Sequence, residues 1–140
     1  DKTFLDLCAG SGAVGFEALS RGAKFAAFIE IDREAVKTIF TNAKNIFEEN
    51  QYKIKRVSAD DYVKRTNDTF DIIFFDPPYH SKIYYEVFLN IFERKLLNDD
   101  GYLFVEMGLE YYKSFLEKVK EHNYEIKTYG ESVLIIFRNI

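Results

Sequence analysis

The sequence has no tryptophan, a single cysteine and only two prolines, which stand next to each other. Because Cys8 has no partner in the chain, an intrachain disulfide is excluded, and we expect a reducing, cytoplasmic environment. No apolar run reaches the length of a membrane span, and no glycine- and serine-rich linker or internal repeat divides the chain. With 140 residues, 47% of them hydrophobic, residues 1–140 are expected to form one domain with a sizeable core.

A strongly basic surface is also missing, because the formal net charge is −4. The lysines and arginines between Lys53 and Arg65 are scattered and indicate a solvated face rather than a stripe that binds phosphates. His80 and His122 fall on different predicted elements, with no cysteine or carboxylate at ligand spacing, so we expect no metal site. Cys8 is expected to be a small, packed and unreactive thiol.

A glycine-rich turn follows the first predicted strand, residues 3–8. Residues 9–15 contain a G-x-G-x-x-G pattern, and the spacing predicts a helix over residues 13–20 that Gly22 ends in a left-handed conformation. The glycines allow a tight turn and a close approach of a ligand to the backbone, while the start of the helix offers free N–H donors. The pattern therefore predicts a nucleoside site, although it fits dinucleotides as well as other nucleoside cofactors.

An acidic residue closes the second predicted strand, residues 24–31. Glu30 lies about 20 residues after the first glycine, where an acid can accept hydrogen bonds from both hydroxyls of a ribose. Ile31 is suited to cover one face of an adenine. Asp32 has a competing role as the N-cap of the next helix, and we expect that role for it.

A further acid, Asp60, follows the strand predicted over residues 52–59. It is positioned to accept a hydrogen bond from an adenine amino group, although a solvated acid in a turn explains it nearly as well. The helix between the second and third strands has apolar residues at helical spacing, all of which are expected to lie in the core: Val36, Ile39, Phe40, Ala43, Ile46 and Phe47.

The stretch Asp76-Pro77-Pro78-Tyr79 follows an apolar run of strand length, residues 70–75. Because two prolines cannot extend a central strand, the chain must turn at Asp76, at the edge of a parallel sheet where ligands bind. Asp76 and a carbonyl before or between the prolines can accept both N–H bonds of an amine, and Tyr79 can stack on the ring that carries it. The structural alternative is a turn in which the acid caps, the prolines stiffen and the tyrosine packs.

The rest of the chain predicts further strands and helices, and then a hairpin. These elements are a helix over residues 84–92, a turn at Asp99-Asp100-Gly101, a strand over residues 102–107, a helix over residues 112–119, and strands over residues 124–129 and 132–137. The last two strands are separated by only two residues, which forces an antiparallel pair. Since the preceding alternation demands parallel strands with right-handed crossovers, we predict an α/β, Rossmann-like doubly wound sheet, mostly parallel, with an antiparallel C-terminal hairpin strand.

Several of these stretches resemble S-adenosylmethionine-dependent methyltransferases. Residues 5–12, Leu-Asp-Leu-Cys-Ala-Gly-Ser-Gly, look like the first motif of that class, and residues 17–23, 76–79 and 129–132 narrow the match. Together they resemble the bacterial 16S ribosomal RNA guanine-N2 methyltransferases of the RsmD type, over nearly the whole chain from Thr3 to Arg138. Residues 76–79 alone indicate methylation of a planar amine, a feature shared with adenine-N6 enzymes, and residues 17–23 are what point to this family.

The resemblance implies the class I methyltransferase fold and a site for S-adenosyl-L-methionine. The glycine loop would hold the methionine part, with Asp6 near its amino group. Glu30 would bind the ribose and Asp60 the adenine. The cofactor-binding residues implied are Asp6, Ala9, Gly10, Ser11, Gly12, Glu30, Ile31 and Asp60, and those on the target base are Asp76, Pro77, Pro78 and Tyr79.

The function implied is methyl transfer to the exocyclic N2 amine of a guanine in 16S ribosomal RNA. We expect a monomer whose partner is ribosomal RNA or the small-subunit particle, without a membrane or a metal. Four alternatives stay open: methylation of an adenine N6, methylation of a protein glutamine, an NAD-binding oxidoreductase and an inert nucleoside-binding module.

The sequence departs from the family at two points. Cys8 stands where the family commonly has phenylalanine, which we interpret as a packing variation. The chain also starts at its first strand without an initiator methionine, whereas the family has an N-terminal arm and helix that help bind RNA. We therefore expect that an N-terminal segment is missing and that catalytic activity depends on it.

Overall fold

A seven-stranded sheet forms the centre of the computed structural model, which describes residues 1–78 and 82–140. The strands lie in the order β3-β2-β1-β4-β5-β7-β6, and β7 runs antiparallel to both of its neighbours while the other pairs are parallel. Their bounds are β1 Thr3–Leu7, β2 Phe25–Glu30, β3 Tyr52–Arg56, β4 Phe70–Phe75, β5 Leu97–Gly108, β6 Tyr124–Tyr129 and β7 Ser132–Arg138. The predicted fold class, a doubly wound and mostly parallel sheet with a C-terminal hairpin, is confirmed.

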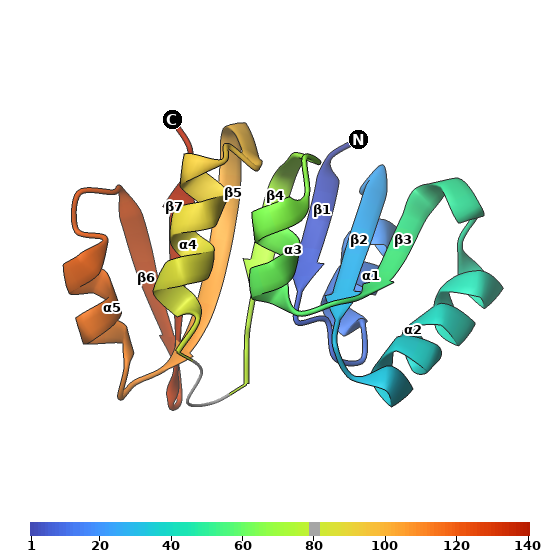
Figure 1. Cartoon of the computed structure of the whole chain (residues 1–140), viewed down its shortest axis with the longest axis horizontal. Coiled ribbons are helices and arrows are strands. Elements are labelled where there is room, and N and C mark those ends of the chain that lie inside the picture. The colour runs from blue at the N-terminus through green and yellow to red at the C-terminus, as the bar shows by residue number, and fades with distance from the viewer. Residues whose placement is uncertain (79–81) are drawn as a thin grey trace.

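Helices cover both faces of the sheet (Figure 1). The helices are α1 Ala13–Ser20, α2 Arg33–Ile46, α3 Ala59–Arg65, α4 Tyr84–Glu93 and α5 Tyr112–Lys118, and a 3-10 turn, η1 Glu49–Gln51, precedes β3. Leu19 of α1 and Ile39 of α2 belong to the smaller core cluster on one face, whereas α3, α4 and α5 enclose the larger cluster on the other. Strands β1 and β2 are therefore buried on both faces, which explains why they are almost continuously apolar, whereas β6 is exposed along its whole length.

Helix α1 packs very close to β2. An ideal Cβ built on Gly15 would lie 2.3 Å from Cε2 of Phe28, so only glycine permits this approach. The helix ends at Ser20, and Gly22, just after the C-cap, has the predicted left-handed conformation, with a φ of 104° and an N–H that donates to the Leu19 carbonyl at 3.1 Å. The close approach at Gly15 holds the start of α1, and with it the end of the preceding loop, against β2.

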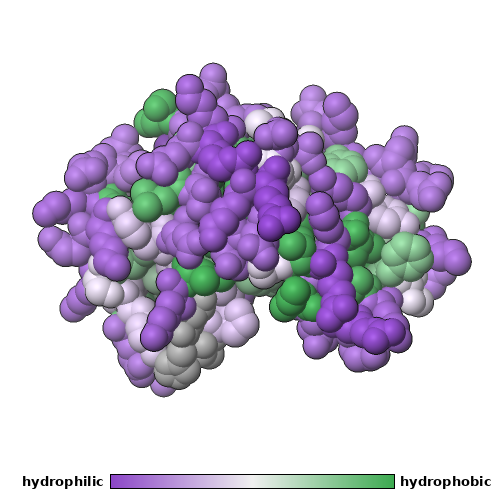
Figure 2. All heavy atoms as spheres, viewed as in Figure 1, coloured by the Kyte–Doolittle hydropathy of each residue, from purple (hydrophilic) through white to green (hydrophobic). Residues whose placement is uncertain are grey.

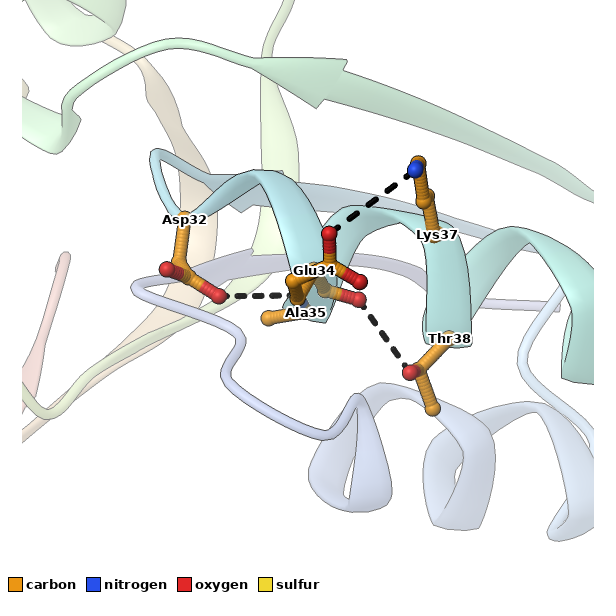
Figure 3. A network of polar contacts seen from close by, with 5 residues as sticks. All are labelled: Asp32, Glu34, Ala35, Lys37 and Thr38. Atoms are coloured by element: carbon orange, nitrogen blue, oxygen red, sulfur yellow. Dashed lines mark hydrogen bonds and ion pairs between the residues drawn. The ribbon is translucent and has the colours of Figure 1, made fainter.

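Helix α2 begins at Asp32, whose predicted role as N-cap is confirmed. Its Oδ2 accepts a hydrogen bond from the Ala35 N–H at 2.9 Å (Figure 3). In the same turn, Glu34 Oε1 lies 3.7 Å from Lys37 Nζ, and the Thr38 hydroxyl donates to the Glu34 carbonyl at 3.2 Å. Because the Asp32 cap that starts α2 lies two residues after Glu30, β2 ends at Glu30, at the carboxyl edge of the sheet.

The prediction that every apolar residue of this segment lies in the core is wrong for two of them. Ile39 and Ala43 are fully buried, but Phe40 is 55% and Ile46 is 68% exposed. A helix on a sheet contacts it along one stripe, and successive side chains are rotated by about 100° around the helix axis. Phe40 directly follows the buried Ile39, so it lies off that stripe.

The third predicted strand is too long, and a helix was missed. Strand β3 ends at Arg56, and α3 begins at Ala59 with Ser58 as its N-cap, whose Oγ accepts the Asp61 N–H at 3.3 Å. Ala59, Tyr62 and Val63 are buried, a helical spacing. Asp60 consequently lies in the first turn of a helix and not at the end of a strand.

Strand β5 starts earlier than predicted. The turn expected at residues 99–101 lies inside it, with Asp100 at a φ of 64°. The pairing of β4 with β5 shifts there, from Phe70 opposite Leu97 to Ile72 opposite Tyr102, so that β5 holds more residues than β4 across the shift. The left-handed residue thus forms a bulge within one strand.

Hydrophilic side chains dominate the face that carries α3 and α4, where apolar atoms form small separate groups (Figure 2). Within residues 1–78 and 82–140, no helix combines the length and the apolar character that crossing a membrane requires.

Candidate functional site

A cleft of ≈ 720 Å³ opens at the carboxyl edge of the parallel strands, the lower edge in Figure 1. Its walls come from the ends of β1, β2, β4 and β5, from the loop before α1 and from the start of α3. It brings together eight of the predicted site residues, namely Ala9, Gly10, Glu30, Ile31, Asp60, Asp76, Pro77 and Pro78. Asp6, Ser11 and Gly12 are not among the residues that line it, and Tyr79 lies outside the described residues.

Glu30 joins the glycine loop to the end of β2. Its Oε1 accepts the Gly10 N–H at 2.6 Å, and its Oε2 accepts the Asp32 N–H at 2.9 Å. The loop is further held by the Ala9 N–H, which donates to the Ile29 carbonyl at 2.8 Å. Because each carboxylate oxygen has two lone pairs, each Glu30 oxygen can accept one more hydrogen bond from a ligand in the cleft.

Asp6 lies beneath the same loop and is 1% exposed. Its Oδ2 accepts the Gly15 N–H at 3.3 Å, which connects β1 to the first turn of α1. Burial raises the pKa of Asp6 to about 7 against the lowering effect of the Gly15 hydrogen bond, and the nearby charges of Asp76 and Glu30 raise it further. The observed contact of Asp6 is therefore with the backbone of α1, directly after the loop.

Ile31 and Asp60 form the far side of the cleft from β4. Ile31 is 56% exposed although it is a large apolar residue, so its side chain is available to cover a flat ring. Asp60, in the first turn of α3, is half-buried and also lines the cleft. The Ile31 carbonyl accepts a hydrogen bond from Arg56 Nε at 2.9 Å, which holds the backbone here and leaves the side chain of Ile31 facing the cleft.

Asp76 and the two prolines form the wall next to β4. Pro77 is buried, whereas Asp76 is exposed in the cleft. Desolvation raises the pKa of Asp76 to about 6, and the charge of Glu106 contributes in the same direction. At neutral pH this carboxyl is therefore largely ionised and can accept N–H donors.

Glu106, Met107 and Tyr84 also line the cleft, and the sequence analysis did not single them out. The Tyr84 hydroxyl donates to the Glu106 carbonyl at 3.3 Å, which ties α4 to β5 at the cleft. The pairing of Phe75 with Val105 makes Glu106 the neighbour of Asp76. No sequence signal marks this neighbour, because β4 and β5 are joined through α4 and their pairing is a property of the fold.

Cys8 borders the cleft with a φ of 63°. Desolvation raises the pKa of its thiol to about 12, and the surrounding carboxylates Glu30, Asp6, Asp76 and Asp60 act in the same direction. The thiol stays protonated at neutral pH, in agreement with the expected unreactive cysteine. Among the described residues, no cluster of histidine, cysteine and acidic side chains could hold a metal ion.

A doubly wound sheet, a glycine loop and an acid at the end of β2 define an α/β protein that binds a nucleoside cofactor. Residues 1–138 match the family model described as Conserved hypothetical protein 95. The chain belongs to this family, the RsmD family, and the resemblance drawn from its motifs is confirmed.

The known proteins to which the chain is similar are named as methyltransferases or methylases. It is 37% identical over 105 residues to the ribosomal RNA small subunit methyltransferase D of Buchnera aphidicola, an alignment that covers 73% of this chain and 53% of that protein. The chain thus spans about half the length of the curated relatives it matches. A crystal structure of a proposed methylase from Haemophilus influenzae has a TM-score of 0.89 at 28% identity, covering 100% of this chain and 88% of that one. A proposed methyltransferase, SMU.776, solved in complex with SAH, shares the fold with a TM-score of 0.83 at 16% identity, covering 98% of this chain and 45% of that one.

Proposed function

We propose that the chain binds S-adenosylmethionine in the cleft and transfers its methyl group to the N2 amine of a guanine in small-subunit ribosomal RNA. The observation that carries this proposal is the charge of the cleft. Of the described residues that line it, five are acidic (Glu30, Asp32, Asp60, Asp76 and Glu106) and none is lysine, arginine or histidine. The names of the relatives, which are ribosomal RNA methyltransferases, support the same substrate.

The negative charge of the cleft discriminates between the two cofactors considered for the glycine loop, NAD and S-adenosylmethionine. NAD carries a pyrophosphate with two negative charges, and an acid at the position of Glu30 is compatible with it, but the four further carboxylates of the cleft, with no basic side chain among the described lining residues, would repel it. S-adenosylmethionine carries a positive sulfonium and a positive amino group against one carboxylate, so an acidic cleft attracts it. The charge therefore favours a methyltransferase over an oxidoreductase.

The residues of the cleft fit S-adenosylmethionine. We assign Glu30 to the two ribose hydroxyls through the lone pairs that its backbone contacts leave free. The exposed face of Ile31 suits the adenine ring, and Asp60 suits its amino group. The start of α1, where the Gly12 N-cap offers no side-chain cap, suits the carboxylate of the methionine part.

The acceptor base is assigned to the β4 side of the cleft. When bound, S-adenosylmethionine would supply an electrophilic methyl group on its sulfonium. The guanine amine is a weak nucleophile, but it becomes acidic as it is alkylated, so the site needs no strong base. Its task is to orient the amine in line with the methyl group, with its hydrogens on the Asp76 carboxylate and the carbonyl of Asp76 or Pro77, before or between the prolines. Stacking by Tyr79 stays a prediction, because that residue lies outside the described ones.

The same proposal includes a monomer in the cytoplasm with ribosomal RNA or the small-subunit particle as its partner. Because the alignment with the Buchnera aphidicola relative covers only 53% of the length of that protein, RNA binding by this chain is itself part of the proposal. The acidic cleft suits a base and a cofactor but not a phosphate, so residues outside it would have to contact the RNA backbone.

Calorimetry with S-adenosylhomocysteine and NAD, titrated side by side into the chain, tests the cofactor. We expect binding of the former only. Transfer of labelled methyl groups to small-subunit ribosomal RNA, followed by digestion to nucleosides, tests the product, which should be N2-methylguanosine. Equal binding of NAD would refute the charge argument, and label in N6-methyladenosine would refute the choice of base.

A further inference from the structure

Glu106 is the carboxylate of the cleft that the proposed reaction leaves without a role. It lies near the end of β5, and its side chain is half-buried. Its carboxylate has no hydrogen bond or ion pair with any residue that the structure describes. A carboxylate that lines the cleft without a protein partner can accept hydrogen bonds from a ligand that binds there.

The position of Glu106 relative to Asp76 is set by the sheet. Phe75 pairs with Val105 between β4 and β5, which lie side by side in Figure 1, and the two acids follow these paired residues directly. The Glu106 charge contributes to the raised pKa of Asp76, which places the two carboxyls within electrostatic reach of each other. A group held by Asp76 is consequently next to Glu106.

The backbone at Glu106 is held firmly. The Tyr84 hydroxyl donates to the Glu106 carbonyl at 3.3 Å, and Glu106 also pairs with Leu134 of β7. Tyr84 is buried and packs edge-on against Phe75 with ring centroids 5.7 Å apart. A carboxylate on such a support can select a ligand by its position.

The nucleobases that carry an exocyclic amine differ at the ring nitrogen beside it. Guanine has two such nitrogens, of which N3 is an acceptor and N1 carries a hydrogen, whereas the one nitrogen beside the amine of adenine (N1) or cytosine (N3) is an unprotonated acceptor. A carboxylate beside the bound amine therefore receives a hydrogen bond from guanine and repels the lone pair of the other two.

We infer that Glu106 is the residue that selects guanine, by accepting a hydrogen bond from N1–H while Asp76 orients the N2 amine. This inference rests on the proposed function. It assigns the two carboxylates different atoms of one base: Asp76 contacts the reacting nitrogen and Glu106 contacts the nitrogen beside it.

The test uses free nucleotides, which need no RNA-binding surface. The full chain is loaded with S-adenosylhomocysteine, and saturation-transfer NMR at millimolar nucleotide compares GMP with 2-aminopurine riboside monophosphate. Both bases carry the same amine, but N1 of 2-aminopurine has no hydrogen. We expect the chain to prefer GMP by about tenfold or more, the size of one hydrogen bond to a charged group.

The variant Glu106→Gln should lose this preference, because an amide can turn either its oxygen or its NH₂ group toward the base. The matched control is Glu125→Gln on the exposed edge strand β6, which removes the same charge far from the cleft and should keep the preference. Thermal unfolding of both variants checks that they fold.

The outcomes distinguish the inference from the function on which it rests. A chain that does not bind S-adenosylhomocysteine would overturn the proposed function. A loaded chain that binds GMP and the analogue equally, or binds neither, would overturn the role of Glu106. The role is also overturned if Glu106→Gln keeps the preference of the unaltered chain.

Discussion

Replacing Asp6 by asparagine should make the stability of the chain less dependent on pH. Burial raises the pKa of this carboxyl from 3.8 to about 7. The folded state thus favours the protonated form, and its stability should fall as the pH rises from the unfolded to the folded pKa. At high pH the ionised side chain costs about 4 kcal/mol, because one pKa unit corresponds to about 1.4 kcal/mol.

The experiment compares the free energy of unfolding of both proteins in urea, at about pH 4.5 and about pH 8. The amide of the variant adds a buried NH₂ group that lacks an acceptor, a penalty of about 1–3 kcal/mol that is the same at both pH values. Subtracting the free energy of unfolding at one pH from that at the other cancels this penalty. Relative to the unaltered chain, the variant should gain about 3 kcal/mol between the acidic and the alkaline measurement.

A control with the opposite sign is Asp71→Asn. The Thr3 N–H, at 2.9 Å, lowers the pKa of Asp71, so this carboxylate stabilises the fold above its unfolded pKa and loses that effect in acid. Its replacement should therefore cost more at high pH than at low pH. If Asp6→Asn changes the free energy of unfolding equally at both pH values, ionisation of Asp6 does not destabilise the folded chain, and the reasoning fails.

Three further predictions concern the cofactor, the acceptor and the packing. Glu30→Ala should weaken the binding of S-adenosylhomocysteine by about 1–3 kcal/mol in calorimetry, since it removes both the proposed ribose contact and the Gly10 hydrogen bond; unchanged affinity would reject the ribose assignment. Methyl transfer should rise with pH through about 6 as Asp76 ionises, and Asp76→Ala should abolish transfer with little change in cofactor affinity; an equal loss of both would place Asp76 in the cofactor site. Gly15→Ala should lower the midpoint of thermal unfolding, because its Cβ would lie 2.3 Å from Phe28 Cε2 and the strain of about 1–3 kcal/mol exceeds the gain in helix propensity; a higher midpoint would show that α1 moves away freely.

The sheet could be predicted from sequence wherever one local signal was sufficient. The hairpin of β6 and β7 followed from a two-residue link, and the start of α2 followed from the Asp32 cap. The short helix α3 was missed, although Ser58 three residues before Asp61 is a capping signal and acidic residues at its start with basic residues at its end favour a helix. The strand pattern of residues 52–56 continues through Val57 to the Ser58 cap, so the sequence predicted a strand over the start of α3.

Features that depend on how elements pack could not be predicted in this way. The periodicity of α2 identified its apolar residues, but the width of its contact with the sheet decides that Ile39 is buried and Phe40 is not. The role now inferred for Glu106 depends on β5 lying beside β4, because 29 residues separate Glu106 from Asp76 and only the strand order makes them neighbours.

The acids at the strand ends indicate a ligand site only when they are considered together. Alone, Asp32 is a helix cap and Asp60 is nearly as well explained as a solvated acid. The cleft collects five carboxylates without one basic side chain among its described residues, and like charges in one cleft oppose folding. The raised pKa values of Asp6 and Asp76 have desolvation as their main cause and the neighbouring charges as a further one. Such an arrangement is kept where a ligand compensates it, and the compensating ligand must bring positive charge and N–H donors. A sulfonium cofactor and a guanine edge together supply both.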